Sequence, residues 1–343
     1  MKRLPAYLLL VLALLMGGCQ QETVPVETGA PILFSGSLQE GGAVLTKADG
    51  PSASSSFLYT GSKFSLYGSW RENASSPSTD LFTQQTVECL DGTAANWGYT
   101  PLRYWRNKGI YHFCAVFPYN ATCEFGTGSD RLVIKYSMHA DHYDLMAAKA
   151  TVDLSATARP EKVNIPFQHA CAAVRFLFRN GVEDDNTVYY LNSFELQNLQ
   201  TMGVFIYDTD NVQATNWHPA DARGASVFGW EAEGDSAFLV PDAYADYAAL
   251  AKPFEDWNYA IPQTLSAFGT AVPSVRFSVR VNSKTATPVY TTLSLLQDTP
   301  TTWEPGKLYT YYIRIQRSAV SISLEVQPWD VYSVYADDIN FNE

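Results

Sequence analysis

The feature that most constrains the fold of this chain is a strict alternation of apolar and polar residues in its second half. The segments Val275–Val281, Tyr309–Ile315 and Ile322–Val326 all follow it. A period of two places every second side chain on the same face of a β-strand, so each segment is predicted to be an antiparallel strand with one buried face. We therefore expect this chain to build sheets rather than helices.

The composition favours the same structural class. Aromatic residues make up 14% of the chain and charged residues only 17%, a balance that favours strands. Ile110–Phe117 is apolar on both faces, which is typical of a central, doubly buried strand. Only Asp242–Leu250 looks helical, because it is alanine-rich, begins with an N-capping Asp and precedes Pro253. The prediction is an all-β fold of two tandem β-sandwich domains with few short helices.

The domain limits are predicted from length and from changes in composition. At 343 residues the chain exceeds the usual size of one domain. The apolar runs give way to polar residues at Ser155–Lys162, so we assign 49–162 to an N-terminal sandwich and 163–343 to a C-terminal one. The preceding segment, 19–48, contains one candidate strand, Pro31–Gln39, and ends in a polar, glycine-flanked loop that begins at Val44.

The N-terminus has the pattern of a secretion signal. Lys2 and Arg3 precede an apolar run, Ala6–Met16, that is too short to span a bilayer. Small residues then lead to Cys19, and this arrangement resembles the lipobox of bacterial lipoproteins. We predict a signal peptide over residues 1–18 and a lipid attached to Cys19. The alternative is an ordinary signal peptide with a chance cysteine, which the agreement of charge, length and small residues disfavours.

Charge and cysteine spacing exclude several classes of function. The formal net charge is −12 and no basic cluster occurs, so nucleic acid is not an expected partner. Cys89, Cys114, Cys123 and Cys171 show no CxxC spacing, which argues against a zinc ribbon or a thioredoxin-like site. An exported location permits disulfides, in any of three pairings. A buried free thiol fits Cys114 and Cys171, which lie in strand-like runs, at least as well.

Histidines and carboxylates gather in one segment. His139, Asp141, His142 and Asp144 offer metal-ligand types within six residues. Asp144 is better explained by the strand that follows it, so no metal or cofactor is expected. We interpret His169, beside an apolar strand, as a hydrogen-bonded core histidine near the domain junction. No catalytic or phosphate-binding motif occurs, so an enzyme is not expected. The sequence leaves open a pair of carboxylates for glycoside cleavage, because such carboxylates come together only in the folded chain.

An aromatic segment offers two interpretations. Trp97, Arg103, Tyr104 and Trp105 could form a platform for sugars, or they could pack in the core of the first sandwich. Large aromatic side chains contribute most to protein cores, so we favour core packing.

Several segments, in a shared order, resemble the fimbrillins, the type V pilus subunits of Bacteroides-like bacteria. They are, in order, Trp97–Trp105, Tyr111–Pro118, Asp144–Ala148, Val163–Ala170, Ile261–Leu265, Trp303–Tyr309 and Trp329. The resemblance covers nearly the whole mature chain. It implies export as a lipoprotein, two transthyretin-like β-sandwich domains, and polymerisation by strand exchange.

The resemblance also implies a processing site. In the family, a protease cuts the loop after the first strand, and the terminal strand of a neighbouring subunit takes its place. Thr46–Ala48 matches the family's T-R-A position, but Lys47 stands where the family has arginine. No arginine occurs between Arg3 and Arg71, so an arginine-specific cut is excluded there. A cut between Lys47 and Ala48 requires a protease that accepts lysine, which leaves both a stalk subunit and an intact anchor or accessory subunit open.

The candidate donor strand is the C-terminal tail, 331–343. Val331, Tyr335, Ile339 and Phe341 share its odd-numbered face. A last strand paired within its own domain, or a loose end, is an equal alternative.

We therefore expect a lipid-anchored subunit of a fimbria on the cell outer membrane, which has other fimbrial subunits as partners and supports adhesion. The alternative is a monomeric adhesin, or an anchor or accessory subunit, that binds a host glycan or protein. A surface enzyme ranks third.

Overall fold

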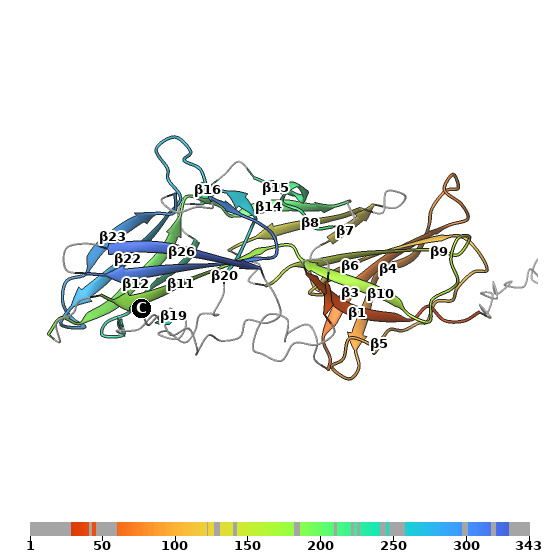
Figure 1. Cartoon of the computed structure of the whole chain (residues 1–343), viewed down its shortest axis with the longest axis horizontal. Helices are drawn as coiled ribbons and strands as arrows, with labels where there is room; N and C mark the ends of the chain where they lie inside the picture. Colours follow the sequence, from red (N-terminus) through yellow and green to blue (C-terminus); the bar gives the residue numbers. More distant parts are fainter. Residues whose placement is uncertain are drawn as a thin grey trace, which may run out of the picture.

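The structure is a computed structural model in which strands make up nearly all regular structure. It describes residues 29–40, 43–45, 60–121, 123–126, 131–139, 143–181, 186–208, 211–220, 223–224, 227–240, 245–246, 258–296, 301–316 and 320–328. Within these ranges the only helix is a 3-10 turn, Ala214–Asn216. The prediction of an all-β chain is confirmed, and the sheets lie along one elongated molecule (Figure 1).

The first half of the chain forms a sheet that closes on itself. In spatial order its strands are β10 (Val163–His169), β9 (Met146–Asp153), β6 (Ile110–Phe117), β3 (Lys63–Arg71), β4 (Thr79–Cys89), β5 (Trp97–Gly98), β1 (Phe34–Glu40) and β2 (Ala43–Leu45). A further pairing between β1 and β10 closes this order into a ring, and β2 pairs with β1 alone. As predicted, β6 is a central strand, with β3 on one side and β9 on the other.

The second half forms two open sheets. One consists of β19 (Ala245–Asp246), β11 (Ala172–Asn180), β25 (Lys307–Ile315) and β26 (Val320–Pro328), with β20 (Asn258–Ala260) also on β11. The other consists of β17 (Val227–Glu231), β12 (Tyr189–Gln197), β22 (Ser274–Val281) and β23 (Val289–Ser294), with β18 (Phe238–Leu239) also on β12. All three alternating segments are strands. Only β25 departs from a purely antiparallel arrangement, because it runs parallel to β11 and antiparallel to β26.

One of three smaller sheets joins the two halves, and the other two lie within the second half. The largest has the order β15 (Trp217–Pro219), β14 (Met202–Tyr207), β8 (Arg131–Ser137) and β7 (Cys123–Gly126). It lies between the halves in Figure 1, and it pairs a strand from before residue 162 with one from after it. Two-stranded sheets pair β13 (Leu199–Gln200) with β16 (Arg223–Gly224) and β21 (Gln263–Thr264) with β24 (Thr302–Trp303). Strand pairing therefore crosses the boundary that composition suggests.

Two segments differ from their sequence-based assignment. The strand that we expected to open the second half, β10, belongs to the first sheet, because it pairs with β9 and β1. The chain enters the second half after it, at Ala170 and Cys171. In the segment expected to be helical, Ala245–Asp246 pairs with β11 as a short strand, so tertiary pairing overrides the helix propensity of alanine there. The other residues of that segment lie outside the described ranges.

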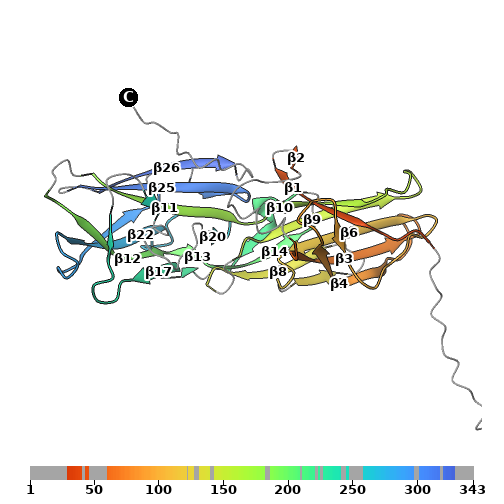
Figure 2. The same ribbon diagram turned by 90° about the horizontal axis from the view of Figure 1, so that it is seen from below.

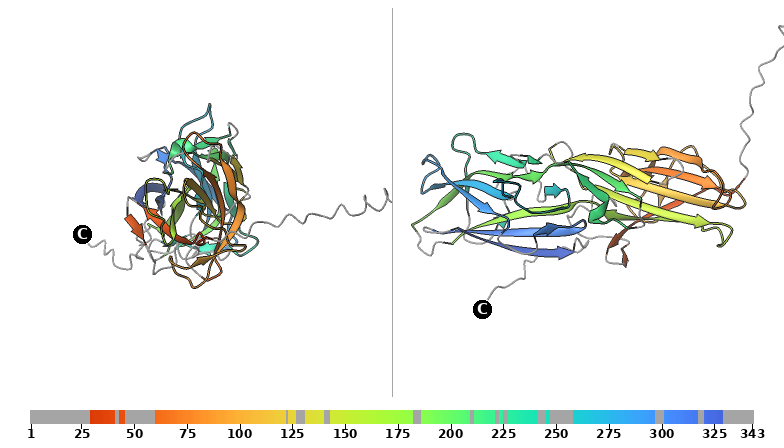
Figure 3. Two further views of the ribbon diagram at one scale, coloured as in Figure 1. Left: turned by 90° about the vertical axis from the view of Figure 1, so that its right-hand side faces the viewer. Right: turned by 90° about the horizontal axis from the view of Figure 1, so that it is seen from above.

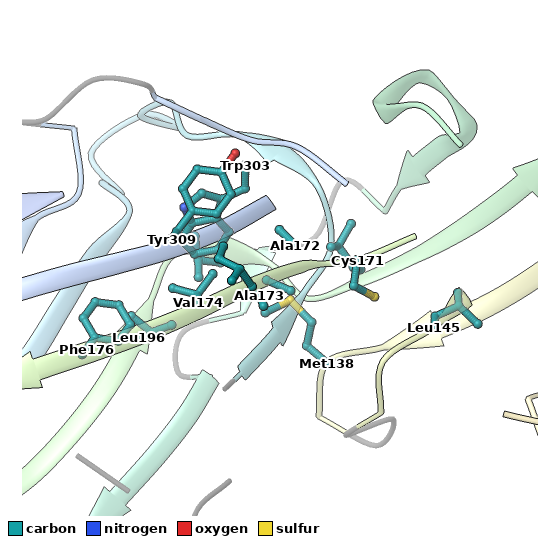
Figure 4. Packing of buried hydrophobic residues seen from close by; sticks show 14 of the residues in the cluster. Met138, Leu145, Cys171, Ala172, Ala173, Val174, Phe176, Leu196, Trp303 and Tyr309 are labelled. Carbon is teal, nitrogen blue, oxygen red and sulfur yellow. The ribbon is translucent and has the colours of Figure 1, made fainter. Parts of the chain in front are cut away.

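The core of the second half is built around Trp303 and Tyr311. The Trp303 indole donates a hydrogen bond of 2.9 Å to the Tyr311 hydroxyl. The Tyr311 ring stacks on Phe176 with centroids 4.9 Å apart. Figure 4 shows Trp303 over Tyr309 and Val174, with Met138 and Leu145 of the first half farther along the same cluster. The two halves therefore share one continuous apolar cluster at their junction.

Candidate assembly site

The strand β1 closes the first sheet. It pairs in parallel with β10 from Phe34 opposite Val163 to Leu38 opposite Phe167, and it meets β5 where Phe34 lies opposite Trp97. Figures 1 and 2 both place β1 beside β10. The ring of strands is complete only while β1 occupies this position, because no other pairing joins β10 to β5 within the described residues.

Alternate side chains of this segment fill the interior. Ile32, Phe34 and Leu38 are almost fully buried. The Phe34 ring has three aromatic neighbours, Phe113, Tyr99 and Phe82, at centroid distances of 5.4, 5.6 and 5.7 Å. Burial of three such apolar side chains contributes roughly 5 to 9 kcal/mol. An empty groove here would expose a large aromatic surface to water.

Backbone hydrogen bonds hold the same segment on both sides. The Ile32 amide donates to the carbonyl of Arg103 at 2.8 Å, and the Trp105 amide donates to the carbonyl of Ala30 at 3.0 Å. On the opposite side the Val163 amide donates to the carbonyl of Leu33 at 2.8 Å. Removal of the segment would leave these groups unpaired, and a buried unpaired group costs about 1–3 kcal/mol.

A tyrosine fixes the entry of the segment into the groove. The Tyr99 hydroxyl donates a hydrogen bond of 2.8 Å to the carbonyl of Ile32. Burial raises the pKa of Tyr99, so its hydroxyl remains a donor at neutral pH. This contact recognises a main-chain carbonyl rather than a side chain. Any extended segment in the same register could therefore accept it.

A short hairpin follows β1. The strand β2 runs antiparallel to β1, with Leu38 opposite Leu45 and Glu40 opposite Ala43. The structure therefore assigns Val44 and Leu45, which we expected in a loop, to a strand. Lys47 follows two residues after the end of β2, so a cut after Lys47 would separate β1 and β2 together from the rest of the chain.

Several predicted site residues lie outside the described ranges. They are the lipid-attachment candidate Cys19, the processing candidates Lys47 and Ala48, and the donor-strand candidates Val331, Tyr335, Ile339 and Phe341. The last described strand, β26, leads into the tail. It pairs with β25, and no strand in the described part of the chain pairs with its other edge.

Comparison with known proteins identifies the family. A family model described as fimbrillin-like matches residues 46–329. The chain belongs to the fimbrillin-like family. None of the curated proteins compared with this chain matches it. The assignment agrees with the resemblance drawn from the ordered motifs.

Solved structures have the same fold as this fimbrillin-like chain. A proposed cell adhesion protein of Bacteroides ovatus matches with a TM-score of 0.57 and 16% identity over 89% of this chain and 99% of its own. A fimbrial protein of Bacteroides vulgatus matches with a TM-score of 0.55 and 12% identity over 88% and 100%. A proposed cell adhesion protein of Bacteroides uniformis matches with a TM-score of 0.53 and 14% identity over 88% and 98%.

The aromatic segment of this fimbrillin-like chain packs in the core. Trp97 and Trp105 are buried, and the Trp105 ring meets Tyr111 at a centroid distance of 4.6 Å. Trp97 meets Phe64 at 4.9 Å. The interpretation as core is confirmed for the two tryptophans, which face the interior that β1 completes, whereas Arg103 is exposed and Tyr104 is half-buried.

The histidine near the junction also has the predicted role. His169 Nδ1 donates to Asp144 Oδ2 at 2.7 Å, and both side chains are buried. The pair lies at the start of the link to the second half, where the Ala170 amide donates to the carbonyl of Leu145 at 2.7 Å. Asp141 and His142 lie outside the described ranges. Among the residues that the structure describes, no group of three or more side chains could hold a metal ion.

Cys89, Cys114, Cys123 and Cys171 form no disulfide. Cys114 and Cys171 are fully buried, which agrees with the buried thiol that the sequence leaves open beside disulfide pairing. Cys123 on β7 is partly buried, and burial raises its pKa to about 11. No helix in the described part of the chain is long and apolar enough to cross a membrane.

Proposed function

We propose that this chain is a structural subunit of a cell-surface fimbria. The supporting observation is the position of β1, the first strand that the structure describes, which closes a sheet and precedes the candidate cut at Lys47. Loss of such a strand would expose an apolar groove and unpaired backbone groups, and a strand from another subunit would satisfy both at once. The partners are other fimbrial subunits, and the function is assembly rather than catalysis.

The route to the surface is export as a lipoprotein. A lipid on Cys19 would hold the precursor at the outer membrane by its leader. A lysine-accepting protease would then cut after Lys47 and release the leader together with β1 and β2. The tail 331–343 of a neighbouring subunit would enter the groove, with Val331, Tyr335, Ile339 and Phe341 toward the interior. Fimbriae assembled in this way would support adhesion.

The second candidate is a lipid-anchored protein that keeps its first strand, as an anchor or accessory subunit or as a monomeric adhesin. Lysine in place of the family's arginine at position 47 favours this candidate. The many contacts of β1 in the intact chain are compatible with both.

Mass spectrometry of the N-terminus of protein recovered from the cell surface, together with native gel migration, separates the two. An N-terminus at Ala48 and a ladder of polymers are expected for the first, and the variant Lys47→Ala should abolish both. An intact, acylated Cys19 on a monomer would contradict the stalk subunit and favour the anchored protein.

A further inference from the structure

The outer face of one sheet in the second half contains a hollow of about 440 Å³. It extends over all four strands in the order β17, β12, β22 and β23. Among the residues that line it are Ser193, Glu195, Glu231, Arg276 and Tyr290. These strands lie at the left of Figure 1, in the half away from β1 (Figure 3, right). The hollow is therefore separate from the assembly site.

Strand register brings these groups together. Glu231 lies opposite Ser193, Ser193 lies opposite Ser278, and Ser278 lies opposite Tyr290. These four residues form one row across the sheet, with small serines in the middle and larger side chains at both ends. The pairing of β12 shifts register on both sides of Ser193. Such irregularities commonly redirect side chains at binding sites.

The polar groups of the hollow are already oriented. The Glu195 carboxylate accepts hydrogen bonds from Gln197 at 2.5 Å and from the Arg276 guanidinium at 3.2 Å. The Ser193 hydroxyl lies 2.6 Å from the hydroxyl of Ser278, which is fully buried. Pre-positioned donors and acceptors lose little conformational entropy when a ligand binds.

Aromatic surface borders the same hollow. Tyr290 is 52% exposed although it lies within a sheet. A ring of this kind offers an apolar face beside a polar edge. The apolar C–H face of a sugar can pack on such a ring while its hydroxyls bond to nearby carboxylates and guanidinium groups.

The charges of the hollow favour a neutral ligand. The Arg276 guanidinium lies 4.9 Å from the centre of the Tyr290 ring, so a protein cation already occupies the position that a ligand lysine would take. Glu195 and Glu231 oppose an anionic ligand, as does the net charge of −12. A neutral polyhydroxylated ring satisfies all of these groups.

We propose that this hollow binds neutral carbohydrate. Glu195, Glu231 and Arg276 hydrogen-bond the sugar hydroxyls, and Tyr290 packs against the sugar ring. The proposal does not depend on how the subunit assembles. It gives a fimbrillin-like chain its own contact with glycans, at a site distant from its first strand.

Saturation-transfer NMR on the full chain tests the proposal. The neutral probes are the methyl glycosides of glucose, galactose, mannose, fucose, N-acetylglucosamine and N-acetylgalactosamine. The charged probes are N-acetylneuraminic acid and Nα-acetyl-lysine amide. At least one neutral glycoside should bind with a dissociation constant on the order of 1 mM. Tyr290→Ala should weaken that binding roughly tenfold, and Glu231→Gln should weaken it as well.

The matched control is Tyr119→Ala, which removes another exposed tyrosine that has a cation, Lys63, 6.0 Å from its ring centre. This variant should bind sugar as the unchanged chain does. Failure of every neutral probe to bind, or equal binding to the Tyr290→Ala variant, would overturn the proposal. Binding of the lysine derivative alone would also overturn it, in favour of a basic protein partner. Polymer formation on a native gel is a separate readout and is expected to be unchanged by these variants.

Discussion

The first sheet closes on itself, whereas the two sheets of the second half stay open. Closure of the first depends on β1, which pairs with β10 across 129 positions of sequence, as the contact between Ser35 and Asn164 illustrates. In the second half, β23 and β26 are edge strands of their sheets. The core there around Trp303 and Tyr311 needs no residue from the leader. A terminal segment can thus be essential to one half and irrelevant to the other.

The largest expected effect comes from the centre of the closed sheet. Phe34→Ala should lower the free energy of unfolding by about 3–5 kcal/mol, because it empties a fully buried site with three aromatic neighbours. Phe277→Ala should do the same for the open sheets, since Phe277 is equally buried. Chemical denaturation measures both.

Hydrogen exchange assigns each loss to one half. Phe34→Ala should mainly weaken protection of β10, and Phe277→Ala that of β22. Phe268→Ala, at a residue 64% exposed, is the control and should change stability by less than about 0.5 kcal/mol. A cost for Phe34→Ala as small as this control would mean that β1 does not hold the first sheet closed.

The next largest loss of stability is expected at the junction between the halves. Asp144→Ala removes the carboxylate bonded to His169 and should cost about 1–3 kcal/mol, because a buried polar group loses its hydrogen-bond partner. Glu88→Gln breaks an exposed pair with Lys63, at 3.4 Å, and should cost less than about 1 kcal/mol. Thermal unfolding of the two variants compares them. Equal small costs would show that the buried pair does not stabilise the junction.

The smallest expected effect on stability comes from the ionisation of Cys123, in the sheet between the halves. Burial disfavours the thiolate and raises the pKa to about 11. At pH 8, alkylation by iodoacetamide should therefore be roughly a hundredfold slower than for an exposed thiol, and it should rise about tenfold per pH unit toward pH 11. The raised pKa also means that its contribution to stability is present below the ordinary thiol pKa and lost as pH rises through about 11.

Peptide mapping of the alkylated protein measures this rate, and Cys123→Ser is the control. A rate that levels off near pH 9 would contradict the burial of this thiol.

Strand identity could be predicted from the sequence, but strand partnership could not. Alternation at Val275–Val281 identifies β22 because a period of two is a local property. The parallel pairing of β10 with β1 is a long-range property, and it moves β10 into the first sheet. The polar segment at Ser155–Lys162 marks a connection between strands and not the end of a sheet.

The candidate sites also differ in whether the local sequence could predict them. The candidates Cys19 and Lys47 are proposed from local motifs alone, and the apolar face of Pro31–Gln39 indicates a buried strand. The carbohydrate hollow could not be predicted, because its row from Glu231 to Tyr290 exists only through the register of four strands. The single sequence signal was an isolated tyrosine at the start of a strand, and this signal is common on protein surfaces.

The central claim is that β1 is a separable strand whose place another strand can take. Its most direct test is hydrogen exchange on a body that begins at Ala48, with and without synthetic peptides 29–45 and 331–343. We predict that β10 and β5 amides lose protection in this body while β22 keeps it, and that either peptide restores it. A body that protects β10 fully without any peptide, and that binds neither peptide, would contradict the account.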